Sequence, residues 1–298
     1  MDDIKIDIEE GLYVVAVSGG VDSMVLLHLL NNQPQLKLIV AHFDHGIRED
    51  SRQDRELVQK VASRYGLPFV FDQTNLGAGA SEAVARKARY QFLNKVLKAS
   101  HADAIITAHH QDDLLETAIF NILRGTNRKG LSSLKSTDTV KRPLLRVSKN
   151  QIRGYALTHG LLWREDYTNL DQNYKRNYIR FSILPRLDPQ QQLELVSILE
   201  SAKATNRQLD AEVEELLISY SQANRLNRRA FIMLPHKIAL EVMAAYLRKN
   251  GIRQFNAKLL SRLVVAAKTL KPGQRIDVNL AYLLQIGQSD LALTSREC

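Results

Sequence analysis

The chain of 298 residues contains a single cysteine, Cys298, at its last position. One cysteine excludes an intramolecular disulfide, and it cannot supply a cysteine-rich metal site or an iron–sulfur cluster. It also excludes a relay in which two cysteines pass sulfur to a substrate. The chemistry of this chain must therefore rest on other side chains.

Long apolar segments are missing as well. No run of about 18 apolar residues occurs, so we expect no membrane span. The N-terminal residues Met1 to Lys5 are acidic and lack the apolar core of a signal peptide. We therefore expect a cytoplasmic protein without membrane contact.

Acidic residues are scarce in the later part of the chain. Residues 1–123 contain 12 Lys and Arg against 17 Asp and Glu, a net charge of −5, so the total of +9 leaves +14 for the rest. Residues 225–275 hold 12 Lys and Arg against one acid, Glu241. This excess of positive charge predicts a domain that binds a polyanion, with nucleic acid as the partner.

Two of the chain's 14 glycines are adjacent, in a segment between a strand-like run at 13–17 and a helical pattern at 21–31. A strand, a loop of small residues and a helix N-terminus form a cradle for phosphate, because loop amides and the helix dipole point to one place. The loop lacks the Gly-Lys-Ser/Thr ending of the Walker type. The predicted phosphate contacts here are Ser18, Gly19, Gly20, Val21, Asp22 and Ser23.

Strand-like and helical patterns alternate through the first part of the chain, and this alternation predicts an α/β fold with a doubly wound parallel sheet. The expected strands are 13–17, 37–43, 68–71 and 104–108. The expected helices are 21–31, 51–65, 81–99, 112–123 and 151–159. Ligands of such a sheet bind at the carboxyl ends of its strands.

The second part of the chain has a different pattern. A break near residue 187, flanked by Pro185 and Pro189, precedes a helical stretch over 191–219. Helices over 235–250 and 256–269 and strands over 275–280 and 282–286 predict a smaller α+β domain. We expect a nucleotide-binding domain at 1–187, a helical linker at 188–220 and a basic domain at 221–298.

Polar residues follow the expected strands where a nucleotide would lie. Ala41 and Phe43 end the second strand, and their backbone atoms are placed to contact adenine. Arg86 and Arg89 share one face of the helix at 81–99, and guanidinium groups suit phosphate oxygens. Taken alone, such an arginine pair is also typical of a solvated surface.

The fourth expected strand runs into His109-His110-Gln111-Asp112-Asp113, with Glu116 one turn later. Carboxylates in this arrangement form a hard oxygen site of the kind that Mg²⁺ prefers. Acidic residues are also good helix N-terminal residues, which is the plainer interpretation. A basic loop containing Arg124 and Arg128 comes next.

Together these segments resemble the tRNA(Ile)-lysidine synthetase family, within the PP-loop ATP pyrophosphatases of the adenine nucleotide alpha hydrolase-like fold. The resemblance covers roughly residues 13–187. It rests on the loop at 18–23, Asp44 to Gly46, Glu82 to Tyr90, His109 to Asp113, Leu123 to Gly125, Arg142 to Leu144 and Arg176 to Pro185. The chain departs from the family at Asn127, where the family has Gly, and at Tyr167, where it has Pro.

The resemblance implies ATP-dependent joining of free L-lysine to the wobble cytidine of tRNA(Ile) with a CAU anticodon, with ATP and Mg²⁺. It assigns Asp22, Arg89, His109 and Asp113 to catalysis, and Asp22 and Asp113 to the metal. Contacts with tRNA or lysine are implied for Asp112, Glu116, Arg124, Arg128, Arg176 and Arg180.

Three other functions are weighed against this one. The first is tRNA 2-thiolation, which the cysteine count disfavours. The second is a small-molecule amide or amidine ligase, which has no need of the basic segment, and the third is an RNA-binding module without activity. A homodimer stays open, and we expect the chain to lack the second C-terminal domain of longer family members.

Overall fold

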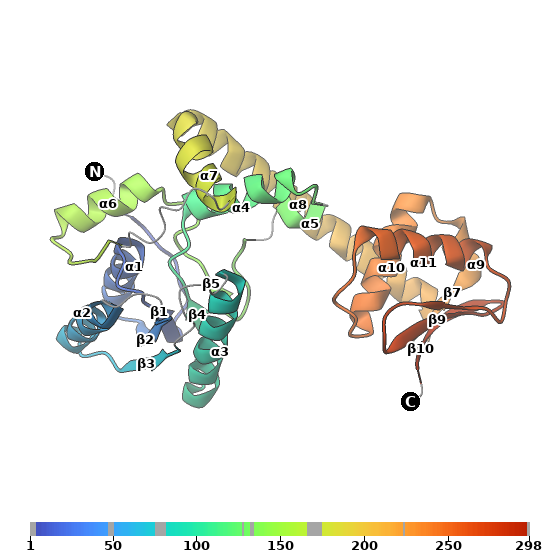
Figure 1. Ribbon diagram of the computed structural model, residues 1–298, viewed down its shortest axis with the longest axis horizontal. Coiled ribbons are helices and arrows are strands. Elements are labelled where there is room, and N and C mark those ends of the chain that lie inside the picture. The colour runs from blue at the N-terminus through green and yellow to red at the C-terminus, as the bar shows by residue number, and fades with distance from the viewer. Residues whose placement is uncertain are drawn as a thin grey trace. The chain divides into compact units, whose positions relative to one another are not determined.

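The computed structural model describes residues 4–46, 51–74, 82–126, 128–131, 134–165, 175–222 and 224–296. The chain forms two compact units, Met1–Lys203 and Ala204–Cys298, and the division falls inside helix α8 (Pro189–Tyr220). Each unit has its own five-stranded sheet and its own buried core (Figure 1).

The sheet of the first unit is parallel throughout and has the order β3-β2-β1-β4-β5. Its strands are β1 (Gly11–Ala16), β2 (Leu36–Asp44), β3 (Phe69–Gln73), β4 (Ala104–Ile106) and β5 (Val140–Lys141). The chain moves outward on one side of β1 and then crosses to the other side at β4. The carboxyl ends of β1 and β4 are therefore the switch point at which such sheets bind ligands.

The helices of the first unit are α1 (Val21–Asn31), α2 (Ser51–Arg64), α3 (Glu82–Ser100), α4 (Gln111–Leu123), α5 (Arg128–Leu131), α6 (Lys149–Thr158) and α7 (Lys175–Tyr178). Five of them, α1 to α4 and α6, were predicted from the sequence, whereas the short helices α5 and α7 were not. A π-helical turn, η2 (Ile179–Ile183), and a 3₁₀ turn, η3 (Leu184–Arg186), follow α7. Pro189 begins α8, so the expected break at residue 187 separates η3 from that helix.

Helices cover both faces of the sheet. Neighbouring residues of a strand point to opposite faces, so each strand contributes side chains to both apolar cores. Val15 and Val40 face a core built with α1, α2 and α6. Val14 and Ala41 face the other way, against Phe92 and Leu93 of α3. The doubly wound parallel sheet predicted from the sequence is confirmed.

A separate apolar cluster anchors α4, whose first turn carries most of the predicted polar residues. Leu115 of α4 packs with Ile179 of η2, Leu184 of η3 and Leu199 of α8. This packing leaves the start of α4 at the carboxyl end of β4, next to the loop that follows β1.

The second unit is the smaller α+β domain that the sequence predicts. Its antiparallel sheet has the order β6-β7-β10-β9-β8. The elements are β6 (Ser221–Gln222), β7 (Arg225–Asn227), α9 (Arg228–Met233), α10 (His236–Lys249), α11 (Ala257–Thr269), β8 (Arg275–Asp277), β9 (Tyr282–Ile286) and β10 (Asp290–Ser295). Phe231, Tyr246 and Leu263 lie in its core. Among the helices of the described ranges, none is both long enough and apolar enough to cross a membrane.

Candidate functional site

A cavity of about 440 Å³ lies at the carboxyl ends of β1, β2 and β4, a volume in the range of small-molecule sites. It is lined by residues from all three strand ends, from the loop after β1 and from α3 and α4. The predicted site residues that line it are Ser18, Gly20, Asp22, Ser23, Ala41, Phe43, Arg89, His109 and Asp113. The fold thus brings together residues that are up to 95 positions apart in the sequence, Ser18 and Asp113.

The loop at residues 18–23, called the phosphate loop from here on, is held in shape by hydrogen bonds of its own side chains. Ser18 donates its backbone N–H to Oγ of Ser23 at 3.1 Å, and that hydroxyl donates to the carbonyl of Gly20 at 2.9 Å. Gly19 has φ +93°, and a Cβ there would lie 3.3 Å from the Cβ of Asp54. Val21 is a buried core residue, so only its backbone can take part in binding.

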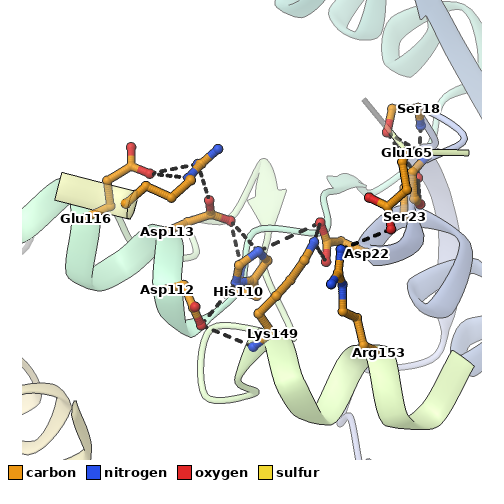
Figure 2. Close-up of polar contacts among 12 residues, drawn as sticks. Ser18, Asp22, Ser23, His110, Asp112, Asp113, Glu116, Lys149, Arg153 and Glu165 are labelled. Atoms are coloured by element: carbon orange, nitrogen blue, oxygen red, sulfur yellow. Dashed lines mark hydrogen bonds and ion pairs between the residues drawn. The ribbon is translucent and has the colours of Figure 1, made fainter. Parts of the chain in front are cut away.

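Asp22, in the first turn of α1, is ion-paired with a residue that sequence reasoning missed. The Nζ atom of Lys149 lies 2.6 Å and 2.7 Å from the two carboxylate oxygens of Asp22 (Figure 2). Lys149 is the first residue of α6 and comes 127 positions after Asp22. No local pattern connects the two positions, so only the fold could reveal the pair.

His110 stands among three carboxylates. Its Nε2 atom lies 3.8 Å from Asp22 and 3.5 Å from Asp113, and its Nδ1 atom lies 3.7 Å from Asp112. Burial by itself lowers the pKa of His110, but Asp112, Asp113 and Asp22 outweigh burial and raise it. The three carboxylates therefore favour the charged form of this imidazole.

His109 has the opposite character, although it is the next residue. Its Nδ1 atom is hydrogen-bonded to the hydroxyl of Thr107 at 2.8 Å. Burial, with the cationic groups of Arg142, Arg89 and Arg86, lowers the pKa of His109 to about 4 against the opposing effect of Asp113. His109 is therefore a neutral imidazole in the cavity wall at neutral pH.

The predicted metal ligands, Asp22 and Asp113, approach the same ring nitrogen of His110 from two helices. Mg²⁺ in proteins is often held by one or two carboxylates together with phosphate oxygens and waters. The described residues contain no group of three or more His, Cys, Asp or Glu arranged to hold a metal. Asp22 and Asp113 are thus two carboxylates of the kind that hold Mg²⁺ together with phosphate oxygens.

The residues predicted to contact tRNA or lysine lie outside the cavity lining. These residues are Asp112, Glu116, Arg124, Arg128, Arg176 and Arg180. Glu116 is buried and lies 2.7 Å from Nη2 of Arg180 and 3.8 Å from Nε of Arg176. Burial raises the pKa of Glu116, against the opposing charge of Arg180. Arg180, in the π-helical turn η2, also reaches Asp113 at 3.4 Å, so this group borders the site.

Arg124 and Arg128 lie near the end of α4. The guanidinium of Arg124 stands 5.2 Å from the ring centroid of Phe120, and that of Arg176 stands 5.3 Å from the same ring. Arg124 is exposed beyond the last turn of α4, and Arg128 begins the short helix α5. Arg124 and Arg176 thus share the ring of Phe120, and neither Arg124 nor Arg128 lines the cavity.

Two further residues that the sequence did not single out hold the phosphate loop from outside. Arg164 donates its backbone N–H to the carbonyl of Gly19 at 3.0 Å. Its Nε atom lies 2.7 Å from Oδ1 of the buried Asp54, and both residues line the cavity. Three residues discussed in the sequence analysis lie outside the described residues. They are Asn127 and Tyr167, where the chain departs from the family, and Cys298, the single cysteine.

In the second unit, part of the positive charge serves the fold. Arg228 donates its guanidinium to the carbonyls of Ala267 at 2.9 Å, Gly287 at 2.9 Å and Leu270 at 2.6 Å, so it closes the end of α11 against the sheet. The remaining basic side chains of this segment are mostly exposed. They include Arg229, Lys237, Arg248, Lys249, Arg253, Lys258, Arg262, Lys271 and Arg275.

A family model described as a PP-loop domain matches residues 3–187. A protein named tRNA(Ile)-lysidine synthase from Solibacter usitatus is 37% identical over 209 residues, which is 68% of this chain and 48% of that protein. Proteins of the same name are 33% identical in Actinobacillus pleuropneumoniae, over 85% of this chain and 62% of theirs, and 31% identical in Nitrosomonas europaea, over 87% and 59%. The chain thus spans 48% to 62% of the length of these relatives.

Among solved structures, a U34-tRNA thiolase from Methanococcus maripaludis is similar with a TM-score of 0.54 and 21% sequence identity. The similarity covers 65% of this chain and 73% of the thiolase. At this identity the likeness concerns the fold alone.

Proposed function

The chain belongs to the PP-loop domain family, and we propose on this basis that it is a tRNA(Ile)-lysidine synthetase. In this proposal it is an AMP-forming ligase that joins free L-lysine to the 2-position of the wobble cytidine in the CAU anticodon of tRNA(Ile). The observation that carries the proposal is the convergence of the loop Ser18–Ser23 and the start of α4 on one cavity. Relatives named tRNA(Ile)-lysidine synthase, at 31% to 37% identity, support the choice of reaction.

The proposed reaction has two steps that balance. The 2-carbonyl oxygen of cytidine attacks the α-phosphorus of ATP, an O–P bond forms, and pyrophosphate leaves with the electrons of the broken P–O bond. The ε-amine of lysine then attacks C2, a C–N bond forms and a proton is lost from the amine. The C2–O bond breaks, and AMP leaves with that oxygen and the electrons of the broken bond. The nucleophile is a substrate, so the chain needs no reactive cysteine.

The cavity residues divide this work among them. The amides of the loop and of the α1 N-terminus bind the β- and γ-phosphates, the charge that departs in the first step. Arg89 from α3 donates to phosphate oxygens in a forked geometry. The neutral imidazole of His109 can donate a hydrogen bond without adding charge, a role that depressed histidines have at other sites.

Asp22 and Asp113 are the residues that would hold Mg²⁺ together with the phosphates. When bound, such an ion stabilises the negative charge of the departing pyrophosphate. We place the adenine against the ends of β1 and β2, where Ala41 and Phe43 line the cavity.

The contacts with tRNA are proposed at two places. At the border of the cavity, where Arg176 and Arg180 contact Glu116, these two arginines bind tRNA together with Arg124 and Arg128. Lysine is recognised by Asp112 and Glu116. The exposed basic residues of the second unit bind the tRNA backbone, with residues 188–220 as a linker between the catalytic domain at 1–187 and the basic domain at 221–298. A target base in an anticodon loop can be turned out at low cost, because it is not in a duplex. We propose a cytoplasmic enzyme, and analytical sedimentation of the purified chain tests whether it forms a homodimer.

The rival functions are less well supported. Thiolation uses persulfides or a cluster held by cysteines, and the sequence has one cysteine. A small-molecule ligase has no use for the 12 Lys and Arg between residues 225 and 275. The loop, Asp22, Asp113 and both histidines are all in place at the cavity or its edge, which disfavours a module without activity.

A single assay tests the proposal. Purified protein is incubated with Mg-ATP, radiolabelled lysine and a tRNA(Ile) transcript with a CAU anticodon, and the label on tRNA is counted. We expect label to appear only with ATP, with release of AMP and pyrophosphate, and not on a methionine tRNA with the same triplet. Absence of label with a folded protein that binds ATP would overturn the proposed reaction but not the nucleotide site.

A further inference from the structure

The phosphate loop of this chain contains no lysine, and the start of α6 brings one to the first turn of α1. We propose that Lys149 is a nucleotide-binding residue whose ammonium competes with a divalent cation for Asp22 and turns to the phosphates when the cation takes that carboxylate. The inference rests on the proposed nucleotide site, but it concerns a residue and an exchange that the proposed function does not include.

The position of Lys149 is fixed by the fold at its backbone. Ser148 caps α6, with Gln151 completing the capping box. The N–H of Lys149 donates to Oδ1 of Asp112 at 3.1 Å, which ties the start of α6 to the start of α4. Ile152, one turn later, is fully buried in the core that α6 shares with α1. The root of the side chain is therefore held by two helices.

The end of the side chain lies at the edge of the nucleotide cavity. Figure 2 shows the ammonium between Asp22 and the start of α4, and Asp22 itself lines the cavity together with Ser18 and Gly20. The side chains of Lys149 and Asp22 are 31% and 26% exposed, so the pair is neither fully solvated nor sealed from ligands. An ammonium has three donors, and Asp22 takes two of them, which leaves a donor that can face a phosphate oxygen.

Competition with a cation follows from the geometry of the carboxylate. Both oxygens of Asp22 lie within 2.7 Å of one ammonium, and a divalent cation that used either oxygen would be held so close to that ammonium that the two would repel. A cation bound at Asp22 therefore displaces Lys149. Because the backbone of Lys149 is fixed, the displaced ammonium stays within reach of the phosphate cradle at the N-terminus of α1, where negative charge is bound.

An exchange between the ammonium of Lys149 and a divalent cation at Asp22 predicts a result that a purely structural role of Lys149 does not. Replacing Lys149 by Met removes the ammonium and keeps the aliphatic volume. The affinity of the nucleotide-free protein for a divalent cation should then rise, because Asp22 becomes available, while the affinity for a polyphosphate should fall. A residue that served only to hold α6 would lower both affinities or neither.

The test uses the full-length chain and its variants Lys149→Met and Lys149→Arg. Mn²⁺ binding without nucleotide is measured by electron paramagnetic resonance, and binding of pyrophosphate and of a non-hydrolysable ATP analogue by calorimetry. For Lys149→Met we expect Mn²⁺ to bind about 10-fold more tightly and the analogue at least about 10-fold more weakly, in keeping with the loss of a close charged partner. Lys149→Arg should keep most of the analogue affinity.

Arg146→Met is the matched control, because it removes an ion pair of similar length, 2.7 Å to Glu200, from the segment just before α6. It should change neither affinity, and thermal unfolding of every variant shows whether the fold is kept. Unchanged or weaker Mn²⁺ binding in Lys149→Met would overturn the competition, and unchanged analogue affinity would overturn the phosphate contact. If the unaltered chain binds no ATP analogue, the proposed function itself fails, so the two failures are distinguishable.

Discussion

Asp113 accepts the backbone N–H of His110 at 3.0 Å with the same carboxylate oxygen that lies 3.5 Å from the ring of His110. One carboxylate thus caps α4 and holds an imidazole in place. The cap keeps the start of α4 at the cavity, and the charge of Asp113, with Asp112 and Asp22, raises the pKa of His110 against the effect of burial. Structure and chemistry at this position can be separated by substitution.

Replacing Asp113 by Asn should keep the cap and remove the charge. We expect Asp113→Asn to unfold at nearly the temperature of the unaltered protein, with lysine transfer lowered by about 10²-fold or more. Asp113→Ala should lose the activity as well as about 1 kcal/mol of stability, because the cap is removed. Calorimetry and the lysine-transfer assay check both. Near-normal transfer by Asp113→Asn would show that the charge has no role.

The acid sensitivity of the fold should depend on His109. Its pKa is about 4 in the folded chain and about 6.5 in the unfolded chain, so between these values only the unfolded state gains a proton. The free energy of unfolding therefore falls as pH drops from 6.5 to 4, by at most about 1.4 kcal/mol per pH unit from this residue. His109→Gln should show a shallower fall in urea titrations at several pH values.

The comparison of the unaltered chain with His109→Gln isolates the contribution of His109. Burial also lowers the pKa values of His28, His42 and His45, but these residues are present in both proteins. His110 acts in another window. Its raised pKa contributes stability that is complete below 6.5 and is lost as pH rises through the folded value. Equal slopes below pH 6.5 in the two proteins would contradict the assignment to His109.

Arg180 should contribute to the stability of the fold, because it is ion-paired with the buried carboxylate of Glu116. Arg180→Met leaves the buried carboxylate of Glu116 with Arg176 alone at 3.8 Å, and we expect the free energy of unfolding to fall by about 3 kcal/mol. The double variant Arg180→Met/Glu116→Gln should recover most of it. Because burial already raises the pKa of Glu116, the loss in Arg180→Met should be smaller at pH 5 than at pH 8. Urea titrations at these two pH values measure it, and a loss that does not change with pH would mean that Glu116 does not change its charge between them.

Arg89 should act through its shape as well as its charge. Arg89→Lys keeps one positive charge but loses the fork that two phosphate oxygens can share. We expect turnover about 10-fold lower, with a higher KM for ATP. Lys87→Ala, an exposed basic residue on the same helix, is the control and should match the unaltered chain. Full activity of Arg89→Ala would assign Arg89 to the solvated surface.

The basic residues of the second unit should set the salt dependence of tRNA binding. Charge reversal at Arg229, Arg248 and Lys249, all exposed, should lower the slope of log K against log salt by about 0.7–0.9 for each phosphate that the variant no longer neutralises. Binding of ATP should not change. Filter binding at several salt concentrations measures the slope, and an unchanged slope would remove this surface from tRNA binding.

Arg228 is left out of that set, because its three carbonyl partners tie α11 to the sheet. Arg228 and its neighbour Arg229 are both among the 12 Lys and Arg of residues 225–275 that predicted a polyanion-binding domain, but the structure uses Arg228 to hold the fold. The two adjacent arginines cannot be told apart by sequence composition, and only the packing of the fold decides that Arg228 is held by carbonyls while Arg229 is exposed.

The sequence by itself determined the features that depend on neighbours along the chain. The alternation of apolar residues predicted every helix from α1 to α4 and the strands β1 to β4 within a few residues. The loop Ser18–Ser23 could be predicted because a strand, a run of small residues and a helix follow one another directly in the chain. Strand β5 was missed, since two residues, Val140 and Lys141, are too few to form a period.

Only the tertiary structure decided which charges meet. Lys149 and Asp22 are 127 positions apart, and Glu116 and Arg180 are 64 apart, so no periodicity relates the members of either pair. The burial of apolar side chains such as Ile152 and Ile179 places α6 and η2, and the polar residues of these elements are carried with them. A sequence records which residues are polar and how they recur, whereas their partners are set by the packing of apolar residues elsewhere in the chain.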